Sequence, residues 1–317
     1  MSLRPLLIVN PKAGAGRAGE GLDGFLRVVE GALGPLDVAK TTAPRHAVDI
    51  AETAAREGRE VVIATGGDGS IHEVANGLLR AREAGFTQAA LGIIGRGTGG
   101  DLCRTLGLEH RLERYLSAIA ARRPRSIDVG RFSYVSPEGE RSTSYFVNIL
   151  SAGLGGLVDS YVHRHSRWAG GKVGYFIASA EALIKSEIGV LKIRVEHEGK
   201  TREEEIVTRQ IAICNGRYFG SGMFVAPMAS VEDGVFEVVD LGKASKLKFA
   251  ASGSAIYSGR HLQSPDVSHF SCQKISIEVL NERARSTFLL DVDGEPLGSP
   301  PLELEVVPKA LPVLLPV

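Results

Sequence analysis

The chain has 317 residues, an apolar content of 44%, and 37 basic and 37 acidic residues, so its formal net charge is zero. This length predicts about two globular domains, and the balanced charge argues against a nucleic-acid partner. Its cysteines (Cys103, Cys214, Cys272) are odd in number and far apart, which fits neither a disulfide framework nor a zinc site. No segment has the eighteen or so apolar residues of a transmembrane helix. We expect a cytoplasmic protein without a membrane span.

The first 125 or so residues alternate strand and helix patterns. Strands are expected at 6–10, 36–42, 60–65 and 89–94, and helices near 20–33 and 46–57, from 70 onward, and up to about 121. Such alternation is typical of a mostly parallel sheet with helices on both faces. The pattern predicts a Rossmann-like α/β domain.

One strand-to-helix junction carries an acidic residue between glycines. After the apolar strand, the chain passes through Gly66, Gly67, Asp68 and Gly69, and Ser70 begins a capping box with the glutamate at position 73. Free N–H groups at a helix N-terminus bind anions. Because a carboxylate would repel a bare phosphate, Asp68 suggests a magnesium ion or a water network. The alternative is an ordinary turn with an N-capping Asp.

Three of the expected strands end in glycine-rich loops, at 11–16, 66–70 and 95–101. In an open parallel sheet, ligands bind beyond the carboxyl ends of the strands. These loops therefore predict a phosphorylated ligand with a metal. Two G-x-G-x-x-G strings, at 14–19 and 95–100, lack the acidic residue of a nicotinamide site at the end of the next strand, and no Walker A sequence is present.

The second half has short strands at close intervals and predicts an antiparallel β-sandwich. Segment 191–198 and the strand after a Gly199-Lys200 turn form an expected hairpin, and one helical stretch is expected near 170–187. Asp293-Gly294 alone reads as a two-residue hairpin turn.

Six motifs give a more specific indication: "NPKAG", "GGDGSIHEVANGL", "GRGTGGD", "IDVG", "NGRYFGSGMFVAPMASVEDGVFEVV" and "DVDGEPL". Their identity and order resemble the diacylglycerol kinase catalytic-domain family, which includes bacterial lipid kinases and the sphingosine and ceramide kinases. The first domain is also similar to NAD kinases and 6-phosphofructokinases. The resemblance implies an ATP-binding domain at 1–127, a β-sandwich substrate domain at 128–302 with the active site in the interdomain cleft, and a segment at 303–317 that returns to the first domain.

The resemblance also implies roles for individual residues. Those implied to bind ATP are Asn10, Pro11, Lys12, Ala13, Gly14, Thr41, Gly67, Asp68, Gly69, Ser70, Ile71, His72, Glu73 and Thr98. Those implied to hold magnesium are Asp68, Asp101 and Asp128 at the catalytic site, and the Ser230 carbonyl, Asp233 carboxylate and Val235 carbonyl in a structural loop. Catalytic roles fall on Asp68, Asp293 and Glu295, and we favour Glu295 narrowly as the general base. A carboxylate can accept the hydroxyl proton in phosphoryl transfer.

The chain departs from the family pattern in one of the glycine loops. Gly95 stands where the family usually has proline, and Gly100 where it has asparagine. Losing that amide removes a polar contact to the nucleotide. No implied carboxylate is lost, so we expect an active enzyme.

A basic stretch surrounds the single tryptophan and is a candidate membrane contact. Arg167 and Trp168, with Lys172, would meet a lipid headgroup or an anionic membrane surface. The alternative is a solvated loop that leads into a helix.

The resulting hypothesis is an ATP-dependent lipid kinase that phosphorylates a hydroxyl of diacylglycerol or a related lipid, acting peripherally at the inner membrane surface. The alternatives are a kinase for a soluble acceptor, such as NAD or a sugar phosphate, and a catalytically silent nucleotide-binding regulator. The sequence leaves open the identity of the lipid and whether the chain forms a homodimer.

Overall fold

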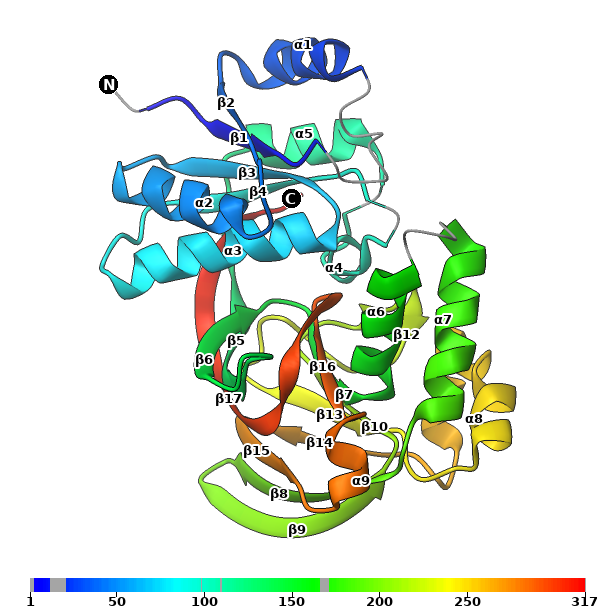
Figure 1. The fold of residues 1–317 in the computed structure, drawn as a ribbon. Coiled ribbons are helices and arrows are strands. Elements are labelled where there is room, and N and C mark those ends of the chain that lie inside the picture. Colours follow the sequence, from blue (N-terminus) through cyan, green and yellow to red (C-terminus); the bar gives the residue numbers. More distant parts are fainter. Residues whose placement is uncertain (1–2, 12–20, 98, 109, 166–170, 317) are drawn as a thin grey trace. The chain divides into compact units, whose positions relative to one another are not determined.

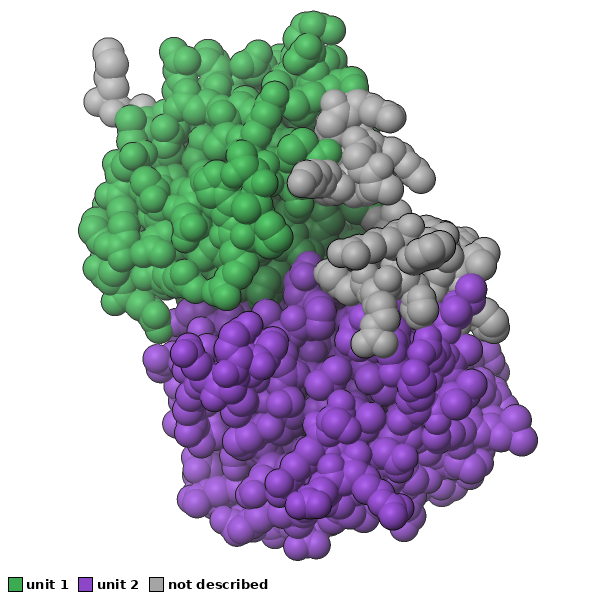
Figure 2. Space-filling view, in the orientation of Figure 1, with its two compact units in different colours: residues 1–129, 220–222, 308–317 green, residues 130–219, 223–307 purple. Residues whose placement is uncertain are grey.

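The computed structural model describes residues 3–11, 21–97, 99–108, 110–165 and 171–316. It divides into two compact units, which Figure 2 distinguishes by colour. Unit 1 comprises residues 1–129, 220–222 and 308–317, and unit 2 comprises residues 130–219 and 223–307. Unit 1 therefore includes the short segment 220–222, which the sequence-based boundaries leave in the second domain.

Unit 1 alternates strands and helices along the chain (Figure 1). Its elements are β1 (Leu6–Val9), α1 (Leu22–Leu33), β2 (Asp37–Lys40), α2 (His46–Arg56), β3 (Val61–Gly66), α3 (Asp68–Glu83), β4 (Ala90–Gly95), α4 (Asp101–Thr105) and α5 (Leu112–Ala120). Strand β5 (Pro124–Val135) leads on into unit 2, and β17 (Glu295–Leu314) ends in unit 1.

The unit 1 sheet is parallel, with the strand order β17-β4-β3-β1-β2. Its central strands are apolar throughout because both faces are covered. Leu7, Ile63 and Leu91 are completely buried. Helices α2 and α3 pack against each other on one face, and α1 and α5 on the other (Figure 1). The strand ends that carry the glycine loops lie along one edge of this sheet.

Unit 2 is built from antiparallel strands with a few helices. Its further elements are β6 (Arg141–Phe146), β7 (Ile149–Gly153), α6 (Leu154–His165), α7 (Gly171–Lys185), β8 (Gly189–His197), β9 (Lys200–Thr208), β10 (Gln210–Cys214), β11 (Tyr218–Phe219), β12 (Met223–Phe224), β13 (Phe236–Asp240), α8 (Lys246–Ser252), β14 (Ser268–Cys272), β15 (Lys274–Val279), α9 (Glu282–Arg285) and β16 (Leu289–Val292). Strand β7 lies between β10 and β16, and β15 lies between β8 and β17.

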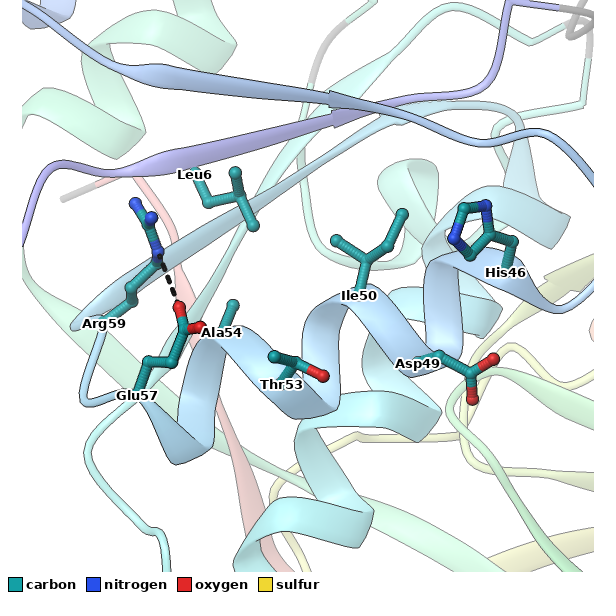
Figure 3. A pocket seen from close by; sticks show the side chains of 8 residues that line it. All are labelled: Leu6, His46, Asp49, Ile50, Thr53, Ala54, Glu57 and Arg59. Atoms are coloured by element: carbon teal, nitrogen blue, oxygen red, sulfur yellow. Dashed lines mark ion pairs between the residues drawn. The ribbon is translucent and has the colours of Figure 1, made fainter.

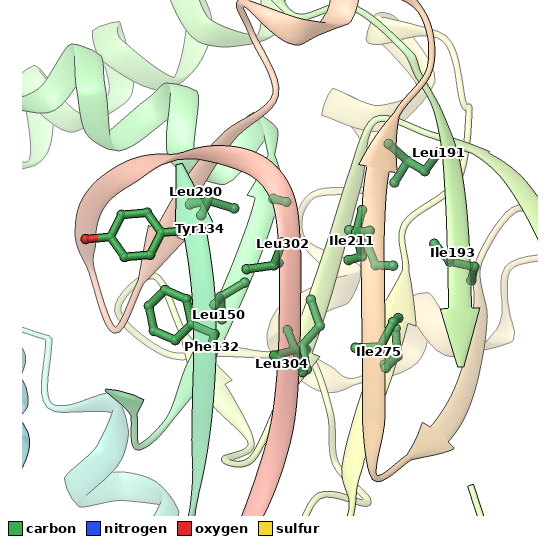
Figure 4. Packing of buried hydrophobic residues seen from close by; sticks show 14 of the residues in the cluster. Phe132, Tyr134, Leu150, Leu191, Ile193, Ile211, Ile275, Leu290, Leu302 and Leu304 are labelled. Carbon is green, nitrogen blue, oxygen red and sulfur yellow. The ribbon is translucent and has the colours of Figure 1, made fainter. Parts of the chain in front are cut away.

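Inward-facing side chains of these strands form the core of unit 2 (Figure 4). Leu150 of β7, Ile193 of β8, Ile211 of β10 and Leu290 of β16 are all completely buried. Alternating inward apolar residues from two layers of strands are typical of a β-sandwich. The predicted antiparallel half is therefore present in the structure.

Two local predictions in unit 2 differ from the structure. The β8–β9 turn is formed by Glu198 and Gly199, both at positive φ (49° and 73°), one residue earlier than predicted. This is the geometry that right-twisted hairpins favour. The pattern also predicts one helical stretch, near 170–187, whereas α6 precedes it. Gly155 and Gly156 weaken the helical signal of α6.

None of the helices in the described ranges combines the length and apolar character needed to cross a bilayer.

Candidate active site

The glycine loops after β3 and β4 touch through their backbones. A Cβ added at Gly97 would lie 2.4 Å from the Cα of Gly67, so only glycine allows this approach. Arg96 also donates its backbone N–H to the carbonyl of Gly66 at 2.7 Å. At the same edge, Asn10 donates to the carbonyl of Thr65 at 3.4 Å, and Thr41 donates to Val9 at 2.9 Å. The loops after β3 and β4 therefore form one continuous backbone surface.

Asp68 connects two of these loops through its side chain. It occupies the first turn of α3, and its Oδ2 accepts the backbone N–H of Gly100 at 2.7 Å. A Cβ added at Gly99 would lie 2.5 Å from the same Oδ2. A carboxylate held at a helix N-terminus is favoured by the helix dipole. Because Gly99 has no side chain, the Asp68 carboxylate can reach the neighbouring loop.

The helix after this loop begins earlier than the capping box predicts. Helix α3 begins at Asp68, so Ser70 lies inside its first turn. Glu73 instead accepts the backbone N–H groups of Arg45, at 3.0 Å, and Ala47, at 3.2 Å. These N–H groups belong to the start of α2, where the chain supplies no side-chain cap of its own. Glu73 therefore caps the neighbouring helix, and the predicted capping box is wrong.

The next two predicted ATP-binding residues are inside unit 1. The side chain of Ile71 is 1% exposed, and its N–H donates to the Gly67 carbonyl at 3.2 Å. His72 is also buried, and the Asn76 side chain donates to its carbonyl at 3.0 Å. Ile71 and His72 therefore pack beneath the loop, on its buried side. The partly exposed residues of the loop are Gly67, Asp68, Gly69 and Ser70.

Asp101 is bonded through both of its carboxylate oxygens. Oδ1 pairs with the Arg104 guanidinium at 2.5 Å, and Oδ2 accepts the backbone N–H of Ser221 at 2.7 Å. Burial raises the pKa of Asp101, and the charge of Asp68 adds to the rise, while the Ser221 bond and Arg104 oppose it. Asp101 therefore anchors segment 220–222 in unit 1, a role that the sequence does not indicate.

Asp128 has a similar role elsewhere in unit 1. It is completely buried, and its Oδ1 accepts the backbone N–H of Lys309 at 2.7 Å. Lys309 has a positive φ of 51°. Asp128 thus secures the last segment of β17 where it joins the parallel sheet.

The glycines that replace the family's proline and asparagine have a structural explanation. A Cβ at Gly95 would lie 2.5 Å from the Tyr115 hydroxyl, and one at Gly100 would lie 2.0 Å from His110 Cε1. The Tyr115 hydroxyl and His110 Nδ1 lie 3.3 Å apart, within hydrogen-bonding distance. Tyr115 and His110 therefore fill the space that larger residues at 95 and 100 would need.

In unit 2, Asp293 and Gly294 form the tight turn between β16 and β17. Both have positive φ, 53° and 90°, and Val292 pairs with Glu295 across the turn. The Asp293 carboxylate accepts backbone N–H groups from Val147 at 2.9 Å, Asn148 at 2.9 Å and Ile149 at 3.0 Å. Asp293 is thus a hairpin residue whose carboxylate also organises the chain before β7.

Glu295 is the first residue of β17 and is partly exposed. Two further carboxyl groups lie near it, on Asp159 of α6 and Asp291 of β16, within hydrogen-bonding reach of each other. The sequence analysis missed this pair. The signal available for Asp291 is its position as the first acidic residue of the "DVDGEPL" motif, two residues before Asp293.

The predicted metal-binding groups differ in how they fit a cation. Among the described residues, no three His, Cys, Asp or Glu side chains group closely enough to hold a metal directly. Asp68 and Asp101 lie within electrostatic range of each other, and Asp101 already has two partners. This donor set fits a magnesium ion that retains most of its water ligands, the usual behaviour of Mg²⁺.

The second predicted metal site lies in the loop before β13. Asp233 Oδ1 accepts the N–H of Val235 at 3.2 Å, and Ser230 Oγ accepts the N–H of Glu232 at 3.3 Å. These bonds hold the loop in a compact turn whose Ser230 and Val235 carbonyls remain chemically suitable for a hard cation.

The described residues do not include six of the predicted site residues: Lys12, Ala13, Gly14, Thr98, Arg167 and Trp168. Pro11 is described and partly exposed. Lys172 belongs to the first turn of α7, of which the backbone alone is described.

A shallow depression of about 280 Å³ lies along α2 (Figure 3). Its lining includes Leu6, His46, Ile50 and Arg59, and the Arg59 guanidinium bonds Asp37 at 2.6 Å. None of its lining residues belongs to a glycine loop or was predicted to act on a substrate. We assign no role to it.

Comparison with known proteins identifies the family. Residues 4–132 match the sequence profile of the diacylglycerol kinase catalytic domain, and residues 148–315 match the YegS C-terminal NAD kinase beta sandwich-like domain. The chain belongs to the diacylglycerol kinase catalytic-domain family. It is 26% identical over 318 residues to the diacylglycerol kinase of Bacillus subtilis (strain 168), covering 99% of this chain and 96% of that protein.

Solved structures agree on the fold. A crystal structure of a diacylglycerol kinase from Bacillus anthracis str. Sterne matches with a TM-score of 0.68 and 21% identity, covering 99% of this chain and 97% of the other. Yeast NADH kinase complexed with NADH matches with a TM-score of 0.52 and 10% identity, covering 99% of this chain and 83% of the other. The predicted fold class, a parallel α/β part followed by an antiparallel β-sandwich, is confirmed. Family membership places the chain among the kinases.

Proposed function

We propose that the chain is an ATP-dependent lipid kinase that transfers the γ-phosphate of ATP to a hydroxyl of diacylglycerol or a related lipid. The observation that carries the proposal is the connection of the β3–α3 and β4–α4 loops through Asp68 and Gly100. A backbone surface built by glycines beside a helix N-terminus suits a polyphosphate. The curated relative named above, a diacylglycerol kinase, supports a lipid as the acceptor.

Unit 1 binds the nucleotide in this proposal. The backbone of Gly67, Gly69 and Ser70 faces the phosphates, and Asn10 and Thr41 contact the rest of the nucleotide. Asp68 and Asp101 would hold a magnesium ion, which would supply positive charge to neutralise the phosphates. Arg104 keeps Asp101 oriented for this role.

Glu295 of unit 2 is the general base. Asp293 is less suited, because its oxygens already accept N–H groups from Val147, Asn148 and Ile149. Glu295 accepts the proton of the lipid hydroxyl as the hydroxyl oxygen forms its bond to the γ-phosphorus. The bond from the γ-phosphorus to the bridging oxygen breaks, and ADP leaves with that electron pair.

The lipid acceptor implies action at a membrane surface. We propose that the protein works at the cytoplasmic face of the membrane as a peripheral enzyme, with Lys172 contributing to headgroup binding. Vesicle flotation with the full chain tests this, with Lys172→Gln as the variant. Equal flotation of both proteins would contradict the role of Lys172.

The activity test uses the full chain with γ-labelled ATP, magnesium and mixed micelles that contain diacylglycerol or other lipids. NAD and sugar phosphates serve as soluble acceptors in parallel reactions. Asp68→Asn and Glu295→Gln are the test variants. The matched controls are Asp49→Asn on α2 and Glu303→Gln on β17, whose side chain is 65% exposed.

We expect label in an organic-extractable lipid, lost in both test variants and retained in both controls. Label in a soluble acceptor alone would contradict the lipid proposal and indicate a kinase of NAD-kinase type. ATP binding without transfer to any acceptor would indicate a regulator.

A further inference from the structure

Two carboxylates in unit 2 share a buried environment that the proposed mechanism does not yet use. Asp159 belongs to α6 and Asp291 to β16, and their carboxyl groups lie within hydrogen-bonding reach of each other. Asp291 is 9% exposed, and Oδ2 of Asp159 is shielded from solvent and has no hydrogen-bond partner among the described residues. Two ionised carboxylates within hydrogen-bonding reach repel each other, so a bond between them requires a proton on one of the two carboxyl groups.

The backbone fixes this pairing. Gly156 lies one helical turn before Asp159, and a Cβ on it would lie 2.3 Å from the carbonyl oxygen of Leu289. A Cβ on Gly155 would lie 2.6 Å from Ser151 Oγ. The two glycines therefore let the start of α6 rest directly on the sheet. In this arrangement Asp159 faces Asp291, two residues along the strand from Leu289.

The hydrogen bonds around the pair show which residue holds the proton. Asp291 Oδ1 accepts the N–H of Gly294 at 2.9 Å, and its Oδ2 accepts Ser151 Oγ at 3.4 Å. Donated hydrogen bonds favour a charged carboxylate. Among the residues that the structure describes, none donates such a bond to Asp159. Asp159 therefore keeps the proton and donates it to Asp291.

The electrostatic balance agrees with this assignment. Burial raises the pKa of Asp159 well above its usual value, and the charges of Asp291 and Glu295 add to the rise. Burial likewise raises the pKa of Asp291, to about 6, although its bonds to Asp159 and Gly294 oppose the rise. Among the described side chains, the charged groups that act on the pair are Asp293 in the turn and Glu295 on β17.

The pair is connected to the proposed base through the turn. Gly294, which Asp291 holds by its N–H, is the residue before Glu295. Asp293 holds the same turn from its other side. Separating Asp159 from Asp291 would release one of these two constraints.

We propose that Asp159 and Asp291 share one proton and position Glu295, by fixing the β16–β17 turn through Gly294. The inference rests on the proposed role of Glu295 as the base. Asp159 and Asp291 are positioning residues, since neither is assigned a contact with substrate. Loss of the shared proton at alkaline pH would leave two adjacent charges, push α6 from β16 and disorder the turn.

The test is the pH dependence of kcat for the full chain and three variants. Asp159→Asn replaces the protonated carboxyl by a neutral amide that still donates to Asp291 but cannot lose a proton. Asp159→Ala removes the donor. Ser160→Ala, which removes a hydroxyl bonded to the Leu157 carbonyl, is the control on the same helix.

We expect Asp159→Asn to keep kcat within about threefold of the wild type near pH 6.5, and to shift the alkaline decline upward by about one pH unit or more. Asp159→Ala should lose about tenfold or more in kcat with little change in KM. Ser160→Ala should leave the pH profile unchanged. An alkaline decline at the same pH in Asp159→Asn and the wild type would overturn the inference.

A separate measurement distinguishes this inference from the proposed function. The wild type should lose thermal stability relative to Asp159→Asn as the pH rises, whether or not the chain phosphorylates a lipid. Identical melting temperatures of the two proteins from about pH 5 to pH 8 would contradict a proton shared by Asp159 and Asp291. A wild type that phosphorylates no acceptor would overturn the proposed function. The melting profiles would still show whether Asp159 and Asp291 share a proton.

Discussion

Asp68 Oδ2 accepts the backbone N–H of Gly100 at 2.7 Å, so one carboxylate joins the loop after β3 to the loop after β4. The bond uses one oxygen of a group that sits in the first turn of α3. The Asp68 carboxylate therefore has two properties. It accepts a structural hydrogen bond, as an amide oxygen also could, and it carries a negative charge, which an amide lacks.

Asp68→Asn should separate these two roles. The amide oxygen of asparagine can still accept the Gly100 N–H, so we expect the melting temperature to stay within about 3 °C of the wild type. Loss of the charge should lower kcat by about 100-fold or more. Circular dichroism melting and the labelled-ATP assay measure the two effects. A variant with normal activity would contradict a role for the Asp68 charge.

The fit between Gly100 and His110 predicts a paired effect. Gly100→Asn should destabilise the protein by about 1–3 kcal/mol, because the new Cβ overlaps the His110 ring. Asparagine tolerates the positive φ of 68° at this position, so the ring is the main obstacle. The double variant Gly100→Asn/His110→Ala should recover most of the lost stability.

Urea unfolding of both single variants and the double variant gives this coupling energy directly. Additive losses would contradict the packing explanation. Gly107→Asn is the matched control, because it has a φ of 69° and nothing lies within 4 Å of an added Cβ.

The sequence predicts the strands and helices of unit 1 well because each apolar strand ends in glycines and each helix has an apolar face. It does not predict the partner of Glu73. A glutamate three residues after a serine matches a capping box, but its carboxylate caps α2, which is 26 residues away in the chain. Local spacing cannot distinguish these two uses of the same side chain.

The same limit applies to the acidic residues. The family motifs predict metal-site roles for Asp101 and Asp128, and the structure shows that the two carboxylates also hold the backbone of Ser221 and Lys309. Those partners are 120 and 181 residues distant, and no sequence periodicity reports such contacts. Asp159 is missed for a similar reason, since its partner Asp291 comes from a separate element.

Asp293 offers a graded test of a buried acceptor. Asp293→Ala leaves the N–H groups of Val147, Asn148 and Ile149 without their acceptor and should cost about 2–4 kcal/mol of unfolding free energy. Asp293→Asn keeps one acceptor oxygen and tolerates positive φ, so its loss should be smaller. Urea unfolding measures the order, with Glu303→Gln as the control on β17. Equal stability of Asp293→Ala and the wild type would contradict the role of the carboxylate.

The raised pKa values of Asp159 and Asp291 predict how stability depends on pH. A carboxyl whose pKa is higher in the folded state binds its proton more tightly there than in the unfolded chain. Its contribution to stability is therefore greatest at low pH. The contribution begins to fall near pH 4, the usual pKa of a carboxyl group in an unfolded chain. It continues to fall as the pH passes about 6, the value to which burial raises the pKa of Asp291 in the folded protein.

We therefore expect the wild type to lose stability relative to Asp159→Asn between about pH 5 and pH 8, by about 1 kcal/mol or more. Above the unfolded carboxyl pKa, the wild type must take up a proton at Asp159 on folding, whereas the amide needs none and still donates to Asp291. The variant should therefore be the more stable protein at pH 8. Differential scanning calorimetry at several pH values, with Ser160→Ala as the control, measures the difference. A gap between wild type and Asp159→Asn that does not change with pH would contradict a shared proton, because only a titrating pair makes the gap depend on pH.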